Sequence, residues 1–146
     1  MSYLGTFRYS IDSKGRLSIP AKFRKILLPE ANGTYMVTKG FDQQCLSLFS
    51  LDEWIKFEES LRGLPRTKKS SRNVVRWFTA NAERVTLDNQ GRINIPKHLL
   101  DFARLKKEAV IIGVLDRIEI WDPEAYKTNT KEVTGTFDEY LESLNL

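Results

Sequence analysis

Hydrophobic and polar residues alternate along several short segments of this chain, and turn residues bound each segment. The pattern is clear at residues 16–19, because Leu17 and Ile19 fall on one side and Arg16 and Ser18 on the other. A period of two predicts a β-strand with one buried face. Further strands are predicted near residues 6–11, 34–39, 45–49, 83–87, 92–95, 109–114 and 117–121.

Helical spacing separates some of these strands. Pro20 is expected to open a short helix, since its missing N–H costs nothing in a first turn. The apolar stripe of that helix would consist of Phe23, Ile26 and Leu27. Ser50 and Glu53 predict a capping box at the start of a second helix. The apolar residues of this second helix, spaced three and four apart, are Trp54, Phe57 and Leu61. Asp122-Pro123 supplies the cap and first position of a third helix.

The pattern occurs twice in the chain. Residues 12–20 recur as residues 88–96, an offset of 76, with identical Asp, Gly, Arg, Ile and Pro. A second block, residues 46–54, recurs as residues 118–126 at an offset of 72. Two matching blocks in the same order indicate a duplication. Each half is too small to bury a good core alone, so we expect the halves to pair.

The repeat therefore predicts an α+β protein that is mainly β. Its duplicated halves would form one small pseudo-twofold β-barrel with short helices. We divide the chain into a first repeat (1–61), a basic helical linker (62–80), a second repeat (81–127) and an acidic C-terminal helical tail (128–146). The tail has a capping-box pattern at Thr136 and Glu139. Its apolar residues at helical spacing are Phe137, Tyr140, Leu141 and Leu144. This tail helix is short, so it must pack on something.

Charge is distributed unevenly between these parts. The 146 residues carry a net charge of +4, but residues 1–121 alone carry +8 and residues 122–146 carry −4. A basic body with an acidic tail favours a polyanionic partner, or partners that meet the two ends. Six Lys or Arg residues and no acid lie between residues 62 and 76. A like-charged helix face is costly without an anionic partner, so we favour a structural role or an oligomer contact for this segment.

Composition excludes several classes of function. No apolar run approaches the length of a membrane span and no signal peptide is recognisable, so we expect a cytoplasmic protein without membrane association. The single cysteine, Cys45, cannot form an internal disulfide and fits a reducing compartment. One cysteine and one histidine, His98, are too few for a structural zinc site, and we expect no metal or cofactor. No catalytic motif is recognisable, so an enzyme is not expected.

The repeated Asp-x-x-Gly-Arg unit is the candidate site. Gly15 and Gly91 can adopt positive φ at a tight turn. Asp12 and Asp88 can accept hydrogen bonds from backbone N–H groups of that turn. The expected DNA contacts are Lys14, Arg16, Gln90 and Arg92. Arginine at a rigid turn suits phosphate binding or bidentate contact with guanine. The alternative is a purely structural turn in which each arginine pairs with its own aspartate.

These residues resemble the MraZ family of bacterial transcriptional regulators, built from two SpoVT-AbrB-like repeats. The resemblance rests on the duplicated Asp-x-x-Gly-Arg…Ile-Pro and on residues 1–7, and it covers nearly the whole chain. It implies a ring of subunits, associated with the nucleoid, that binds short direct repeats in the promoter of its own operon. That operon is the cell-division and cell-wall gene cluster, and the family usually represses it. The family's Asp-x-x-x-Arg motif faces DNA and maps onto residues 12–16 and 88–92.

Two other classes of function stay open at this point. A protein-interaction module, such as the antidote half of a toxin pair, is the main alternative, because related swapped-hairpin folds serve there. RNA binding would need aromatic side chains exposed on a sheet, whereas the aromatic residues here follow buried patterns.

Overall fold

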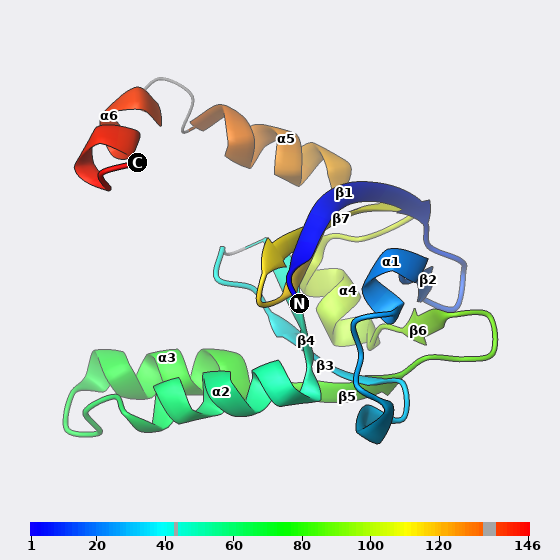
Figure 1. Cartoon of the computed structure of the whole chain (residues 1–146), viewed down its shortest axis with the longest axis horizontal. Coiled ribbons are helices and arrows are strands. Elements are labelled where there is room, and N and C mark those ends of the chain that lie inside the picture. Colours follow the sequence, from blue (N-terminus) through cyan, green and yellow to red (C-terminus); the bar gives the residue numbers. More distant parts are fainter. Residues whose placement is uncertain (43, 133–136) are drawn as a thin grey trace.

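Six antiparallel strands form the central sheet of the computed structural model, which describes residues 1–42, 44–132 and 137–146. The strand order is β1-β7-β8-β4-β3-β5 (Figure 1). The bounds are Tyr3–Ser10 for β1, Glu108–Leu115 for β7, Ile118–Trp121 for β8, Cys45–Ser50 for β4, Thr34–Lys39 for β3 and Glu83–Thr86 for β5. A separate two-stranded ribbon pairs β2 (Arg16–Ser18) with β6 (Arg92–Asn94). All eight predicted strands are confirmed, with ends shifted by up to three residues.

The pairing register reveals a pseudo-twofold axis between the halves. In the ribbon, Leu17 pairs with Ile93, its own equivalent in the second repeat. In the large sheet, Ser47 of β4 pairs with Glu119 of β8, which is again its equivalent. The outer strands are exchanged: β1 of the first half pairs with β7 of the second, and β5 of the second half pairs with β3 of the first. The two halves are therefore interleaved into one structure.

The predicted closed barrel is not confirmed. The large sheet begins at β1 and ends at β5, and no ladder joins these two strands within the described ranges. The ribbon of β2 and β6 forms its own sheet, linked to the large one through the bridge between Ile11 and Leu17. The observed architecture is thus an open sheet and a ribbon around a shared core.

One main core lies between the sheet, the ribbon and two short helices. Leu17 and Ile93, at the centre of the ribbon, have no exposed surface. Phe23 from α1 (Ala21–Arg24) and Leu99 from α4 (Lys97–Ala103) belong to the same cluster. The two helices follow the two ribbon strands at equivalent places in the repeat. The core is therefore built equally from both halves.

The remaining helices lie outside this core. Helices α2 (Leu51–Arg62) and α3 (Lys69–Thr79) form an antiparallel hairpin that extends away from the sheet (Figure 1). Helix α5 (Pro123–Glu132) follows β8, and α6 (Phe137–Ser143) lies beyond it. A short 3-10 helix covers Pro29–Ala31. Among the helices of the described ranges, none combines the length and apolar character needed to cross a bilayer.

Local predictions were partly wrong at the helix ends. Helix α1 stops at Arg24, so Ile26 and Leu27 lie beyond it, although both still pack against the core. The side chain of Ser50 makes no capping hydrogen bond, because Ser50 is also the buried last residue of β4. The third helix is confirmed: Asp122 Oδ2 accepts a hydrogen bond from Ala125 N at 3.1 Å, and α5 begins at Pro123. Thr136 of the tail capping box lies outside the described residues.

Candidate nucleic-acid interface

The first Asp-x-x-Gly-Arg turn joins β1 to β2 and is organised by one carboxylate. Asp12 Oδ1 accepts hydrogen bonds from the backbone N–H groups of Lys14 and Arg16, both at 2.9 Å. Asp12 Oδ2 accepts a third from Arg16 Nε at 2.6 Å. Gly15 has φ +80°, a conformation that L side chains rarely adopt. The aspartate thus fixes both the backbone of the turn and the guanidinium that follows it.

The second turn repeats this arrangement between β5 and β6. Asp88 Oδ1 accepts from Gln90 N at 2.8 Å and from Arg92 N at 3.0 Å, while Oδ2 accepts from Arg92 Nε at 2.8 Å. Gly91 has φ +75°. Both halves therefore position an arginine in the same way, and each arginine pairs with its own aspartate as the structural alternative predicted.

The two turns are also tied to each other. Ile19 N donates to Gly91 O and Ile95 N donates to Gly15 O, both at 3.0 Å. Arg92 Nη1 lies 4.0 Å from Asp12 Oδ2, so the second arginine reaches the first carboxylate. Both turns lie at the same end of the molecule, opposite the α2–α3 hairpin (Figure 1). The structure thus brings all eight predicted site residues to one end.

Hydrogen bonding lowers the pKa of both aspartates. The pKa of Asp12 falls to about 2, chiefly through the backbone N–H of Arg16, with the Arg16 side chain and Lys14 N–H adding to the effect. The pKa of Asp88 falls for the same reasons, led by the backbone N–H of Arg92. Both carboxylates are therefore ionised near neutral pH, and each can hold its arginine by a charge-assisted bond.

The guanidinium ends stay accessible. The side chains of Arg16 and Arg92 are 34% and 24% exposed. The printed contacts of Arg16 with Asp12 use the Nε edge, at 2.6 Å from Oδ2, and the Nη groups lie at the outer end of the guanidinium. A guanidinium anchored at Nε and open at its Nη end can donate two parallel hydrogen bonds to a phosphate or to a guanine edge.

The turns differ in their neighbouring charges. Lys14 is exposed in the first turn, whereas Gln90 stands at the equivalent place in the second. The second turn instead packs against Arg24: a Cβ on Gly91 would lie 2.7 Å from Arg24 Cζ. Leu100, the repeat equivalent of Arg24, occupies the matching place beside Gly15. The repeat offset of 76 aligns residue 24 with residue 100, but it does not show that each lies beside the turn of the other half.

A hollow of about 660 Å³ lies beside the first turn. Its basic lining residues are Lys14, Arg84, Lys97 and Lys106. Lys97 and Lys106 were not predicted as site residues, because a single surface lysine outside a motif cannot be distinguished from any other solvated lysine in the sequence. Lys97 also pairs with Asp101 at 3.2 Å. Arg8, on β1, forms an ion pair with Glu108 of β7 at 2.7 Å.

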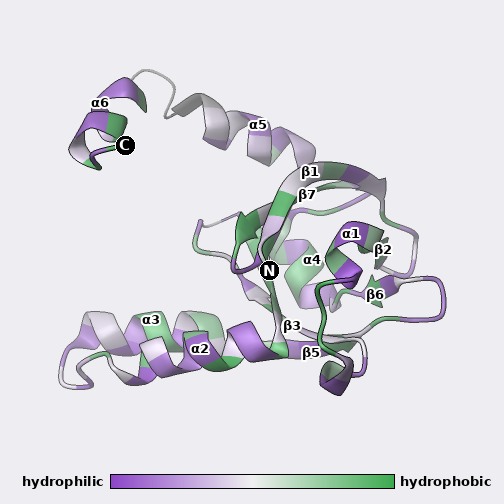
Figure 2. Cartoon of the chain, in the orientation of Figure 1, coloured by the Kyte–Doolittle hydropathy of each residue, from purple (hydrophilic) through white to green (hydrophobic). Residues whose placement is uncertain are grey.

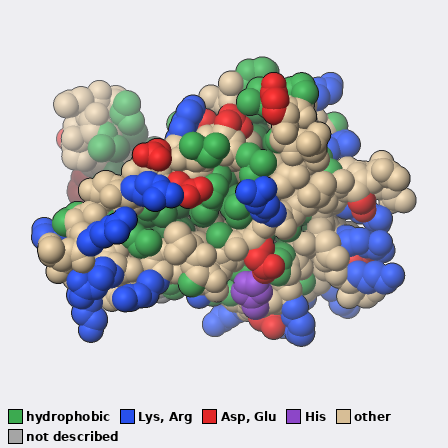
Figure 3. All heavy atoms as spheres, turned by 90° about the horizontal axis from the view of Figure 1, so that it is seen from below, with side chains coloured by type: hydrophobic (Ala, Val, Ile, Leu, Met, Phe, Trp, Pro, Cys, Tyr) green, Lys and Arg blue, Asp and Glu red, His purple; other side chains and the backbone are tan. Residues whose placement is uncertain are grey.

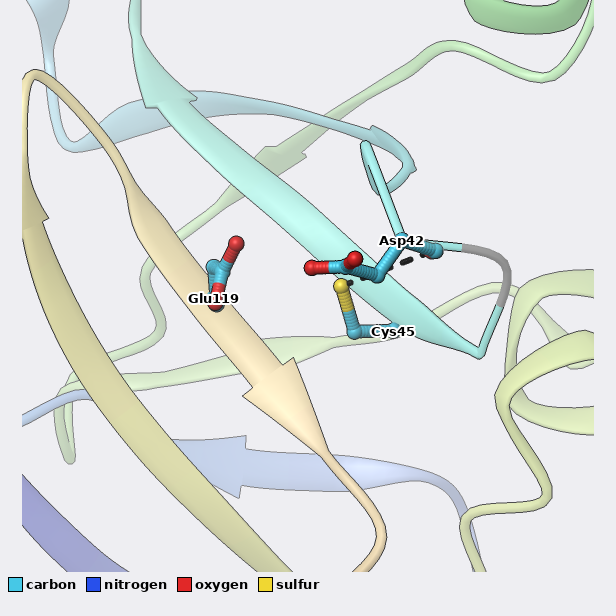
Figure 4. Close-up of side chains that lie close together, drawn as sticks. All are labelled: Asp42, Cys45 and Glu119. Carbon is cyan, nitrogen blue, oxygen red and sulfur yellow. Dashed lines mark hydrogen bonds between the residues drawn. The ribbon is translucent and has the colours of Figure 1, made fainter. Parts of the chain in front are cut away.

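A second cluster of reactive side chains lies in the large sheet, away from the turns. Asp42, Cys45 and Glu119 offer ligand atoms within 4.8 Å of one another (Figure 4). Glu119 is already hydrogen-bonded to Trp121 Nε1 at 3.0 Å and paired with Arg117 at 3.4 Å. Burial, together with the charges of Glu119 and Asp42, raises the pKa of the Cys45 thiol to about 12. Cys45 Sγ donates a hydrogen bond to the backbone oxygen of Asp42 at 3.7 Å, so neighbouring protein groups engage both Cys45 and Glu119.

The remaining candidates have structural contacts. His98 Nδ1 lies 3.5 Å from Glu83 Oε2 on the surface. Trp54 and Trp121 are buried in small apolar clusters, and Trp77 donates from Nε1 to Gly40 O at 3.0 Å. The prediction that these aromatic residues pack rather than stack on bases agrees with the burial of Trp54 and Trp121 and with the partial burial of Trp77.

The interleaved fold and the paired turns define a class of protein in which a duplicated unit presents two equivalent Asp-x-x-Gly-Arg loops. Residues 2–77 and 78–142 each match the family described as "MraZ protein, putative antitoxin-like". The chain is also 44% identical to the "Transcriptional regulator MraZ" of Caldanaerobacter subterraneus subsp. tengcongensis, over 97% of this chain and 96% of that protein. The chain belongs to the MraZ family.

Proposed function

We propose that this protein regulates transcription by binding DNA sequence-specifically through its two Asp-x-x-Gly-Arg turns. It acts as a repressor of its own operon, the cell-division and cell-wall gene cluster, and works in the cytoplasm at the nucleoid. The observation that carries the proposal is the identical anchoring of Arg16 and Arg92 by Asp12 and Asp88 at one end of the molecule. Support for a role in transcription comes from the 44% identical relative, which is named a transcriptional regulator.

Each turn has a distinct part in this proposal. Asp12 and Asp88 hold the arginines by Nε, and Gly15 and Gly91 allow the turn. Arg16 and Arg92 then contact base edges or phosphates through their Nη groups. Lys14 contacts phosphate, and Gln90 can reach a base edge but adds no charge.

The proposed target is a set of short direct repeats, read by a ring of subunits. Identical turns presented at a fixed rotation can meet DNA sites one helical turn apart, about 10 bp. Each subunit binds weakly, and several sites in series raise the effective concentration. A modest basic excess per subunit is thereby multiplied along one DNA-facing surface.

Selection of bound duplexes from random DNA tests the proposal directly. We expect tandem repeats among the selected sequences. Gel-shift titrations of the selected duplex should then show that Arg16→Ala weakens specific binding by about 10-fold, which is within the 1–3 kcal/mol expected for one bidentate contact. Lys56→Ala, on α2 at the other end of the molecule, is the matched control. Selection without repeats, or unchanged affinity and salt slope for Arg16→Ala, would refute the proposal.

A second function is favoured by the family description, which contains the words "antitoxin-like". In this alternative the protein is a protein-interaction module that neutralises a toxin. Affinity capture of full-length protein from cells, compared between wild type and Arg16→Ala, separates the two. A stoichiometric protein partner retained by Arg16→Ala, combined with no selected DNA sequence, would favour the antidote function.

A further inference from the structure

The α2–α3 hairpin carries a groove of about 380 Å³ far from the two turns. The residues that line it are Glu58, Leu61, Arg62, Leu64, Arg66, Ser71, Arg72, Val75, Arg76 and Thr79. In Figure 3, Lys and Arg side chains gather around this end of the molecule, beside a band of hydrophobic side chains. The DNA-binding proposal gives this groove no role.

The chemistry of the groove suits an acidic, amphipathic ligand. Its floor is apolar and includes Leu61, Leu64 and Val75. Arginines surround the floor, and only Arg62 among them has carboxylate partners, Glu58 and Glu59, in the described ranges. Arg72 Nη1 donates to Arg66 O at 2.9 Å, and Arg76 Nη1 donates to Asn73 Oδ1 at 3.2 Å. The positive charge of the rim is therefore largely uncompensated within the hairpin.

The opposite chemistry occurs on the tail helix. Phe137 and Tyr140 of α6 are 56% and 55% exposed, and Leu144, in the turn that follows the helix, is 65% exposed. Their spacing of three and four residues places them along one side of the tail. No residue of α6 is buried. Its acidic residues are Asp138, Glu139 and Glu142. An isolated helix of this length is marginal in water, so an apolar face of this kind needs a surface to cover it.

The same chain does not cover this face in the structure. Helix α6 lies well apart from the α2–α3 hairpin (Figure 1), and its hydrophobic residues are visible on an otherwise hydrophilic helix (Figure 2). We propose that α6 of one subunit docks into the α2–α3 groove of a second copy. The apolar face then meets Leu61, Leu64 and Val75, and the acidic residues meet the arginine rim.

A second copy fits the groove better than nucleic acid does. A phosphate backbone would match the arginines but would leave the apolar floor uncovered, whereas an amphipathic acidic helix matches both. The contact is also heterologous, because the tail and the groove are different surfaces. Head-to-tail contacts of this type generate rings when the rotation closes. The inference deepens the oligomer part of the proposed function and rests on it.

Disulfide trapping tests the contact in the full-length protein. Two variants, Val75→Cys and Tyr140→Cys, are co-refolded, oxidised and examined by non-reducing gel. We expect a covalent dimer that contains one chain of each variant. The mixture separates this contact from docking within one chain, and the buried native Cys45 does not interfere. Lys127→Cys, exposed on α5, replaces Tyr140→Cys as the control. Equal trapping with the control, or no mixed dimer, would overturn the proposal.

Charge exchange supplies an independent readout. Sedimentation of Arg72→Glu should show smaller assemblies, and adding Glu139→Arg in the same chain should restore them. If Arg72→Glu lowers DNA affinity while the subunit number stays unchanged, the groove binds DNA and the inference is wrong. The DNA-binding proposal and the tail-contact proposal can be refuted independently. If the protein forms intact assemblies but selects no repeated DNA sequence, only the DNA-binding proposal is refuted. Intact assemblies in Phe137→Ser/Tyr140→Ser with normal DNA selection count against the tail contact alone.

Discussion

Lys14 provides the sharpest test of how the first turn meets DNA. Its backbone N–H donates to Asp12 Oδ1, a bond that any residue except proline can make, and its side chain is exposed. Lys14→Gln therefore leaves the turn intact and gives it the side chain that the second turn carries at Gln90. We expect unchanged stability and a change confined to DNA binding.

The magnitude follows from counterion release. The loss of one phosphate contact makes the plot of log affinity against log salt concentration less steep by about 0.9. Between 50 and 200 mM salt this corresponds to a change of about 3.5-fold in the ratio of wild-type to variant affinity. The reciprocal variant Gln90→Lys should steepen the slope by about 0.9, because the two turns have the same geometry.

Fluorescence anisotropy of a labelled duplex with a single repeat measures these slopes without multiplying them over several sites. Lys56→Gln on α2 is the control for a lost charge at a distance. An unchanged slope for Lys14→Gln, or an equal change for Lys56→Gln, would show that the first turn does not contact phosphate. A normal effect of Lys14→Gln with no effect of Gln90→Lys would show that only the first turn reaches DNA.

Other predictions concern stability and reactivity. Leu17→Ala should lower the free energy of unfolding by about 3 kcal/mol, because the side chain is fully buried. Leu4→Ala, on the exposed face of β1, is the control and should change the free energy of unfolding little. Urea denaturation followed by tryptophan fluorescence measures both variants. Gly15→Ala should lower the free energy of unfolding by about 1–3 kcal/mol in the same assay, because a side chain at φ +80° is strained and its Cβ would lie 2.9 Å from Leu100 Cδ1. A decrease of less than about 0.5 kcal/mol would contradict the observed turn. The folded-state pKa of Asp12 lies below its unfolded value, so its stabilising contribution is present above about pH 4 and is lost as the pH falls towards 2. Asp12→Asn should therefore flatten this part of the plot of urea midpoint against pH. An unchanged plot would show that Asp12 does not stabilise the turn. Cys45 should react with a thiol reagent only on unfolding, because burial raises its pKa to about 12; rapid reaction of the native protein would contradict its burial.

The turns and strands could be predicted from the sequence because their signals are local. Alternation at Leu17 and Ile19 reports a half-buried strand, and the repeated glycine reports a turn that needs positive φ. The duplication supplied the pairing of halves, since neither half can bury a core alone. The carboxylate–arginine fork also followed from residue types at a fixed spacing.

Longer-range features had no local signal. A period of two shows which face of a strand is buried but not which strand lies beside it. The exchange of β1 and β5 between the halves and the open edges of the sheet could therefore not be predicted from the sequence. Helix α1 is shorter than its apolar spacing suggested, because the backbone continues after Lys25 in i→i−3 turns, with Ile26 N donating to Phe23 O and Leu27 N to Arg24 O. Arg24 reaches the second turn only through the pseudo-twofold fold, and a single surface arginine gives no hint of this.

The exchange of strands between halves also sets the order in which the chain can fold during synthesis. Tyr3 pairs with Leu115, so β1 has no partner strand until about 110 further residues have been made. At bacterial rates of translation of roughly 5–20 residues per second, that interval is roughly 5–20 s. Throughout it, the ribosome carries an unpaired strand with a hydrophobic face, and neighbouring ribosomes on the same messenger carry identical strands. Correct assembly within one chain therefore depends on keeping nascent copies apart until β7 has emerged.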